Sequence, residues 1–194
     1  QGDASVSFAG KMGNGLTLDG SGDYAQASDD GAFVVDDDWS IEAWIKADST
    51  TSTAIIGIAD GDGNEEDNEL SIHFNSADQL QVCSGGESFC AATPETFSTG
   101  TWYHIAVTYD EGEDNVDIYI NNKRVVENNG FVTLTGTVSN ADIIIGKSDE
   151  STATDTFDGI IDEVRILDYQ SMAFAGGLMI TKVAGNFQGA GTIT

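Results

Sequence analysis

The chain has 194 residues, and its 33 Asp and Glu against seven Lys and Arg give a formal net charge of −26 at pH 7. This charge argues against nucleic acid and anionic membrane surfaces as partners, because both are bound through basic side chains. The length suits one domain, the 40% hydrophobic content is enough for a globular core, and no apolar run reaches the roughly 20 residues of a membrane-spanning helix.

Segments that alternate hydrophobic and polar residues follow one another along most of the chain. The predicted strands, in chain order, are 40–47, 102–109, 116–120, 132–134, 142–145 and 160–167. Clusters of Gly, Asn, Asp and Ser separate them, and Asn121-Asn122 suits the tight turn of a hairpin. No segment has the period of an amphipathic helix. Many short strands with turns between them predict an antiparallel β-sandwich.

Two cysteines, Cys83 and Cys90, bracket the sequence SGGESF within a segment typical of a hairpin. A disulfide across its two strands is the favoured interpretation, and two reduced, half-buried thiols are the alternative. The bridge would indicate an oxidising, extracellular compartment. The start at Gln1, without an initiator Met, also suggests a processed, secreted chain.

Six segments resemble, in the same order, the laminin G-like domain of the concanavalin A-like lectin superfamily. They are DGSGDYAQ (19–26), DDDWSIEAWIKAD (36–48), GTWYHIAVTYD (100–110), VDIYINNKRV (116–125), IIIGK (143–147) and FDGIIDEVRIL (157–167). The resemblance implies an all-β fold, an antiparallel jelly-roll β-sandwich that we expect over residues 1–170. It places Trp44, Trp102 and Ile105 in the core, and Asp162–Arg165 at a salt-bridged edge of the last strand.

Aspartates in glycine-rich turns suggest calcium, which binds hard oxygen ligands. The resemblance implies a structural calcium ion near the rim of the sandwich, and the matching positions are Asp19, Asp23, Asp158 and Asp162. The alternative is that these aspartates only cap turns. A weaker candidate is the acidic loop 60–69, in which Asp60, Asp62 and Asn64 have the spacing of a calcium loop, but its later Gly and Glu are missing.

The C-terminal extension, residues 171–194, contains no Asp or Glu and is rich in apolar residues. Members of the family usually have an aromatic-rich N-terminal strand beside the last strand, and here only QGDASVSFA precedes Lys11. The extension can therefore take the place of this N-terminal strand, beside the last strand of its own subunit. Alternatively, it can complete the sheet of a neighbouring subunit by strand exchange. The third alternative is a disordered or lipid-contacting tail. The residues expected at an intersubunit contact are Met172, Phe174, Leu178, Ile180, Val183 and Phe187.

The sequence shows no catalytic constellation. His73 and His104 lie in predicted strands with no nucleophile pattern beside them, and the Glu-x-Asp-x-x-Glu segment of the superfamily's glycan hydrolases does not occur. Carbohydrate binding needs exposed aromatic rings, and because the three tryptophans lie in expected core segments, the remaining candidates are Phe89, Phe131 and Tyr169.

We therefore expect a non-catalytic extracellular subunit with structural calcium that assembles with copies of itself, through its termini, into a filament or surface layer. The alternatives are a calcium-dependent carbohydrate-binding or adhesion module and a glycan hydrolase.

Overall fold

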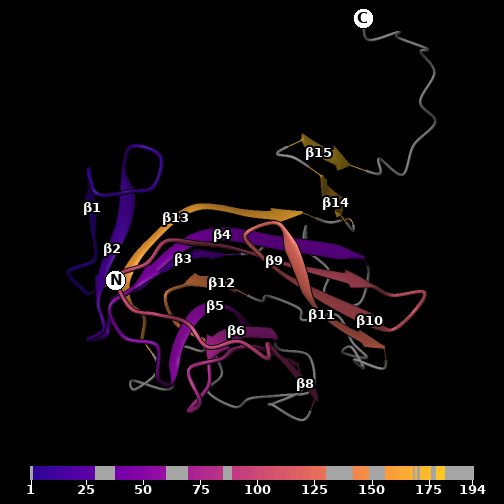
Figure 1. The fold of residues 1–194 in the computed structure, drawn as a ribbon. Coiled ribbons are helices and arrows are strands. Elements are labelled where there is room, and N and C mark those ends of the chain that lie inside the picture. Colours follow the sequence, from indigo (N-terminus) through magenta and orange to yellow (C-terminus); the bar gives the residue numbers. More distant parts are fainter. Residues whose placement is uncertain are drawn as a thin grey trace, which may run out of the picture.

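A computed structural model describes residues 2–28, 38–59, 70–84, 89–129, 142–148, 156–167, 169, 171–175 and 178–181, and its elements in this part are all strands (Figure 1). They are β1 (Ser5–Ser7), β2 (Gly15–Asp19), β3 (Ala25–Ser28), β4 (Trp39–Ala47), β5 (Thr53–Ala59), β6 (Leu70–Phe74), β7 (Leu80–Ser84), β8 (Phe89–Ala92), β9 (Tyr103–Asp110), β10 (Asn115–Ile120), β11 (Lys123–Asn129), β12 (Asp142–Ile145), β13 (Asp158–Leu167), β14 (Ser171–Ala175) and β15 (Leu178–Thr181).

The strands form two main sheets in which neighbouring strands are antiparallel. The seven-stranded sheet has the order β1-β2-β13-β4-β9-β10-β11, and the six-stranded sheet has the order β3-β12-β5-β6-β7-β8. Figure 1 shows β13 and β4 in the upper layer and β5 and β6 in the lower layer. The predicted antiparallel β-sandwich is confirmed, while the strand expected at 132–134 lies outside the described residues.

Local sequence explains the hairpin between β10 and β11. Ile120 pairs with Lys123, so Asn121 and Asn122 form a two-residue loop. Their φ angles are 50° and 66°, a left-handed conformation that asparagine tolerates better than most residues. The tight turn predicted at this Asn-Asn pair is therefore confirmed.

The core lies between the two sheets and follows from the alternation along each strand. In β4, Ile41, Ala43 and Ile45 are at most 1% exposed. Trp39 is fully buried on the same side and stacks on Tyr109, with 5.8 Å between ring centroids. Because successive side chains point to opposite faces of a strand, the residues between them face away from the core. We call this outward side of the seven-stranded sheet the polar face; it includes Glu42, Trp44, Lys46, His104, Asp117 and Arg165.

The expected core position of Ile105 is confirmed, whereas that of Trp44 and Trp102 is wrong. Ile105 is 2% exposed, but both tryptophans are only half-buried. Trp44 is paired with His104 on the polar face, and Trp102 lies beside Lys46. The reason is the strand period of two, which points Trp44 away from the side on which its neighbours are buried.

The last long strand, β13, is an interior strand and not an edge. It pairs with β2 through Asp158–Ile161 and with β4 on its other side. A β-bulge between Asp162 and Arg165, with Glu163 at a φ of 50°, changes the register against β4. Arg165 forms an ion pair with Glu42 on β4, at 3.1 Å, so this salt bridge joins two interior strands of the sheet and does not lie at an edge.

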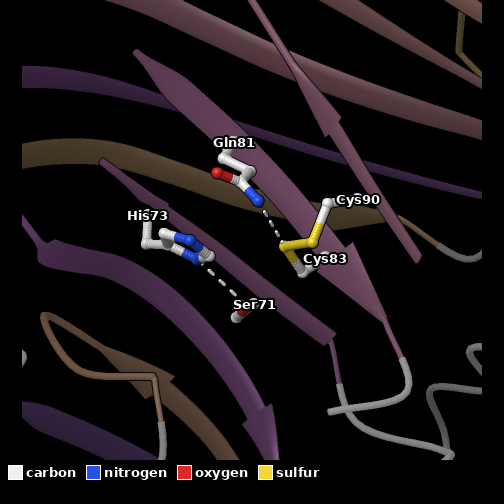
Figure 2. The surroundings of a disulfide bond; sticks show 5 residues. All are labelled: Ser71, His73, Gln81, Cys83 and Cys90. Carbon is white, nitrogen blue, oxygen red and sulfur yellow. Dashed lines mark hydrogen bonds between the residues drawn. A yellow bond between two sulfur atoms is a disulfide. The ribbon is translucent and has the colours of Figure 1, made fainter. Parts of the chain in front are cut away.

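The two cysteines form a disulfide between directly opposed positions of β7 and β8, as predicted. Figure 2 shows its surroundings on the outward side of the six-stranded sheet, where the Gln81 amide nitrogen lies 3.1 Å from Cys83 Sγ. The Ser71 hydroxyl lies 3.1 Å from His73 Nδ1. His73 is therefore a half-buried residue within strand β6, as its sequence position predicted.

The described part of the C-terminal extension forms a separate hairpin. β14 and β15 pair with each other, with Met172 opposite Ile180, and make a two-stranded sheet of their own. In Figure 1 this hairpin lies beyond the end of β13 and outside both layers. The place beside the first half of β13 is occupied by β2, and the short strand β1 follows β2 at the edge.

Candidate functional site

Three carboxylates from the N-terminal hairpin region form an acidic cluster: Asp3, Asp19 and Asp23. One carboxylate oxygen of each lies within 4.8 Å of the others. Asp23 is 2% exposed, and its carboxylate accepts hydrogen bonds from the backbone N–H of Asp3, at 2.8 Å, and of Asp19, at 3.3 Å. Gly2 has a φ of 65°, and a Cβ at this position would collide with the Asp23 carboxylate. Glycine therefore allows the N-terminal segment to lie against Asp23.

The carboxylates of the acidic cluster repel one another. The pKa of Asp3 is raised by a hydrogen bond with the Asp23 carboxyl and by the negative charges of Asp23 and Asp19. Three carboxylates at this spacing supply the hard oxygen ligands that Ca²⁺ takes, so the donor set fits a calcium ion. A bound divalent cation would replace the mutual repulsion by attraction to its own charge.

The structure groups the predicted calcium ligands differently from the expectation. Asp19 and Asp23 lie together, and Asp158 is directly opposite Asp19 in the sheet, with its pKa raised by burial and by the charges of Asp48 and Asp19. Asp162 lies roughly 13 Å further along β13. Its carboxylate accepts hydrogen bonds from the backbone N–H groups of Met12 and Glu163, both at 2.8 Å. The acidic loop with Asp60, Asp62 and Asn64 lies outside the described residues.

Asp3 is the member of the acidic cluster that sequence reasoning missed. It lies 20 residues from Asp23, and the hydrogen bond from its backbone N–H to that side chain brings the two together. Its one local signal is Gly2, which precedes it and permits the left-handed backbone.

The polar face contains a charged group centred on Glu42. Its carboxylate is 3.1 Å from His104 Nε2 on one side and 3.1 Å from Arg165 Nη1 on the other. These contacts are cross-strand, because Glu42 is on β4 while its partners come from β9 and β13. Glu42 is only 5% exposed, so the paired charges compensate much of the cost of burying its carboxylate.

Two tryptophan rings lie on the polar face, and one of them, Trp44, is next to this charged group. The Trp44 ring is 5.2 Å from the imidazole of His104, at an interplanar angle of 59°. The Nζ of Lys11 stands over the Trp44 ring at 4.3 Å from its centroid, and that of Lys46 stands over the Trp102 ring at 5.6 Å. The polar face thus combines half-buried aromatic rings with ammonium, guanidinium, imidazole and carboxylate groups.

A second polar network continues across β10 and β11. The Asp117 carboxylate accepts hydrogen bonds from Arg124 at 3.1 Å, from the Tyr119 hydroxyl at 3.2 Å and from the Asn115 side-chain amide at 3.3 Å. Arg124 also pairs with Glu127 at 3.0 Å. Burial, with the charge of Asp117 and the hydrogen bond to it, raises the pKa of Tyr119 to about 12, so its hydroxyl remains a donor.

The aromatic residues named from the sequence as sugar contacts lie elsewhere. Phe89 is 43% exposed at the start of β8 in the other sheet. Tyr169 is half-buried, and its backbone carbonyl accepts a hydrogen bond from the Ser40 hydroxyl at 2.9 Å. Phe131 lies outside the described residues. Trp44 and Trp102, which were expected in the core, share the polar face with several polar groups.

Exposed apolar side chains gather in the N-terminal hairpin. Val6, Phe8 and Met12 are 71%, 94% and 60% exposed. Of the predicted intersubunit residues, Met172 and Phe174 are on β14, and Leu178 and Ile180 are on β15. Val183 and Phe187 lie outside the described residues. Within the part of the chain that the structure describes, no helix is long and apolar enough to cross a membrane.

A laminin G model, described as the concanavalin A-like lectin/glucanases superfamily, matches residues 19–171. The chain belongs to this superfamily. No curated protein matches it in sequence.

Solved structures of the superfamily fold resemble the chain at low sequence identity. Domain 4 of AbnA, a GH43 extracellular arabinanase from Geobacillus stearothermophilus in complex with arabinotriose, has 23% identity and a TM-score of 0.65, over 88% of this chain and 77% of that one. The CBM40 of the Ruminococcus gnavus IT-sialidase, bound to α2,3-sialyllactose, has 12% identity and a TM-score of 0.64, over 80% and 90%. A heptameric SAP-like pentraxin from Limulus polyphemus has 14% identity and a TM-score of 0.57, over 71% and 65%.

Proposed function

We propose that this domain is a non-catalytic, extracellular carbohydrate-binding module and that sugar binds on the polar face. The observation that carries the proposal is the outward position of two tryptophan rings, with Trp44 beside His104 and its partner Glu42, and Trp102 beside Lys46. Aromatic rings stack on the apolar faces of sugars, and charged or amide groups next to them bond the hydroxyls. Two structures with the same fold are complexes with arabinotriose and with α2,3-sialyllactose, which supports the ligand class.

Two other features support the proposed setting of the module. The Cys83–Cys90 disulfide is typical of an oxidising, extracellular compartment. The acidic cluster at Asp3, Asp19 and Asp23 is proposed to hold a structural calcium ion. Such an ion would fix the N-terminal segment to β2, in the same hairpin from which Lys11 reaches the polar face.

A glycan array tests the proposed function when the full chain is compared with two variants. Trp44→Ala removes a ring on the polar face, and Phe89→Ala removes an exposed ring in the other sheet and serves as the matched control. We expect the original chain and Phe89→Ala to bind the same glycans and Trp44→Ala to bind them at least about ten-fold more weakly. Absence of binding by the original chain, or equal binding by all three, would contradict the proposal.

A second candidate function is self-association through the termini, into a filament or surface layer. The observation that favours it is the presence of two acid-free, apolar hairpins, β1–β2 up to Leu18 and β14–β15, in a chain of net charge −26. In the first hairpin, Val6, Phe8 and Met12 are exposed, and exposed apolar side chains grouped in this way often mark protein interfaces. The acidic surface of one copy repels the acidic surface of another, so contact between copies is least opposed at these two acid-free hairpins.

Sedimentation of the full chain and of a chain ending at Tyr169 tests self-association. The experiment is run with calcium and with high salt, which screens the repulsion between copies. Larger species are expected only for the full chain, which retains β14–β15. If both chains sediment as monomers under every condition, the assembly proposal is wrong and the binding proposal is unaffected.

A further inference from the structure

The basic residues of this acidic chain are concentrated on the polar face. The whole sequence has seven Lys and Arg against 33 acids. Four of the seven have their contacts on the polar face: Lys11, Lys46, Arg124 and Arg165. Because most of the cations lie on one side of one sheet, this face differs electrostatically from the rest of the molecule.

The acids of the polar face are already paired. Glu42 is paired with His104 and Arg165, and Asp117 with Arg124. Asp162 is bonded by two backbone N–H groups. The charge of these acids is therefore compensated within the protein, and the two guanidinium groups are used for that purpose.

Lys11 and Lys46 are different, because the contacts of their ammonium groups are to tryptophan rings. Each stands over a ring on the polar face, at 4.3 Å and 5.6 Å from the centroids of Trp44 and Trp102. Neither forms an ion pair within the described residues. Among the described residues no carboxylate compensates these two ammonium groups, so they can pair with an anionic group of a ligand.

The two lysine–tryptophan pairs also lie close to one another. Trp44 and Lys46 are two residues apart on β4 and share its outward side, so their positions are about 7 Å apart along the strand. Trp102 immediately precedes β9, the neighbour of β4. One saccharide of a few sugar units can therefore contact a ring and an ammonium group at the same time.

From this arrangement we infer that the polar face selects anionic saccharides, that is, sugars that carry a carboxylate or a sulfate group. The ring of Trp44 or Trp102 contacts the sugar, and Lys11 and Lys46 pair with its acidic groups. Lys11 leaves the Trp44 ring to do so, since one side chain cannot cover the ring that the sugar contacts. This inference rests on the proposed carbohydrate-binding function and specifies the class of ligand. The excess of acids elsewhere on the chain keeps such a ligand away from other surfaces.

Titration calorimetry with matched trisaccharides tests the inference. The three probes are trisaccharides of galactose, of galacturonic acid and of galactose 6-sulfate, which share the sugar ring and differ in the group at carbon 6. We expect the uronate or the sulfate to bind at least about ten-fold more tightly than the neutral sugar, and comparison of the two identifies which acid is preferred. The advantage should fall when salt is raised from about 50 mM to about 500 mM, because the ion pairs are partly exposed.

Charge-matched variants locate the site. Lys46→Gln removes one cation from the polar face, while Lys123→Gln removes an exposed cation at the β10–β11 turn and is the control. Lys11→Gln with Lys46→Gln should abolish the preference for the acidic sugars, each change weakening their binding about five-fold, and Lys123→Gln should preserve it. Near-ultraviolet circular dichroism verifies that each variant is folded.

Each contrary outcome has a separate meaning. Equal or tighter binding of the neutral trisaccharide overturns the anionic class and leaves carbohydrate binding intact. A preference for acidic sugars that survives the double lysine change overturns the site. Absence of binding by all three probes, together with an empty glycan array, would overturn the proposed function itself.

Discussion

The two tryptophans of β4 should differ in how much their loss destabilises the chain. Trp39 is fully buried and stacks on Tyr109, so Trp39→Ala should cost about 3–5 kcal/mol of unfolding free energy. Trp44 is half-buried, and its contacts with Lys11 and His104 are worth about 0.5–1 and about 0.5–1.5 kcal/mol. Trp44→Ala should therefore cost about 1–2.5 kcal/mol.

These free energies convert to melting temperatures through the entropy of unfolding. At about 2.1 cal/mol/K per residue, a chain of 194 residues has an unfolding entropy of about 0.4 kcal/mol/K. Trp39→Ala should then lower Tm by about 7–12 °C, and Trp44→Ala by about 2–6 °C. Thermal unfolding followed by circular dichroism measures both, with Trp39→Phe as a milder variant should the alanine variant fail to fold.

Accessibility to a neutral quencher gives an independent reading of the same difference. The fluorescence of each tryptophan is obtained as the difference between the original chain and the variant that lacks it. Acrylamide should quench the contribution of Trp44 more strongly than that of Trp39. A Trp44→Ala variant that is as unstable as Trp39→Ala, with both rings protected from acrylamide, would mean that Trp44 belongs to the core and that the polar face is wrongly described.

Three further predictions concern the disulfide and the aspartates. Replacing Cys83 and Cys90 by Ser removes a cross-link between residues seven positions apart and should lower the free energy of unfolding by about 2.5 kcal/mol. Calorimetry should detect this as a fall in Tm of about 6 °C, and an unchanged Tm would contradict the prediction. Calcium at about 100 times its Kd should stabilise the chain by about 2.7 kcal/mol. EDTA or Asp3→Asn should remove this stabilisation, whereas the control variant Glu113→Gln should keep it. A Tm that does not change with calcium would exclude the ion. Because the pKa of Asp158 is raised above its ordinary value, its charged form is disfavoured in the folded state, and stability is lost as pH rises through the folded pKa. Asp158→Asn should therefore raise Tm near pH 7 without calcium and leave it nearly unchanged under acidic conditions in which the carboxyl is protonated; a lower Tm near pH 7 would contradict the sign.

The fold could be predicted because its signals are local. Alternation along β4, the Asn121-Asn122 turn and the spacing of strands depend on residues close in sequence, and the structure confirms them. The same alternation already separated Trp44 from Ile41 and Ile45. Trp44 was assigned to the core because it lies in a segment that resembles the family, but the alternation of the strand was the better guide.

The candidate site depends on contacts between distant residues, and sequence reasoning could not find them. Asp3 joins Asp23 through a backbone N–H, and Lys11 reaches Trp44 from the N-terminal hairpin. The β-bulge in β13 changes its register, and Arg165 lies opposite Glu42 and pairs with it. None of these pairings has a fixed spacing in the sequence.

The most direct test of a sugar site on the polar face is a titration of the labelled chain with the galacturonate trisaccharide, followed by NMR. The chain has three tryptophans, so its spectrum contains three indole N–H signals, one for each of Trp39, Trp44 and Trp102. We predict that the Trp44 and Trp102 signals move in proportion to saturation while the signal of the buried Trp39 stays in place. Saturable binding that leaves the Trp44 and Trp102 signals unmoved would contradict the account.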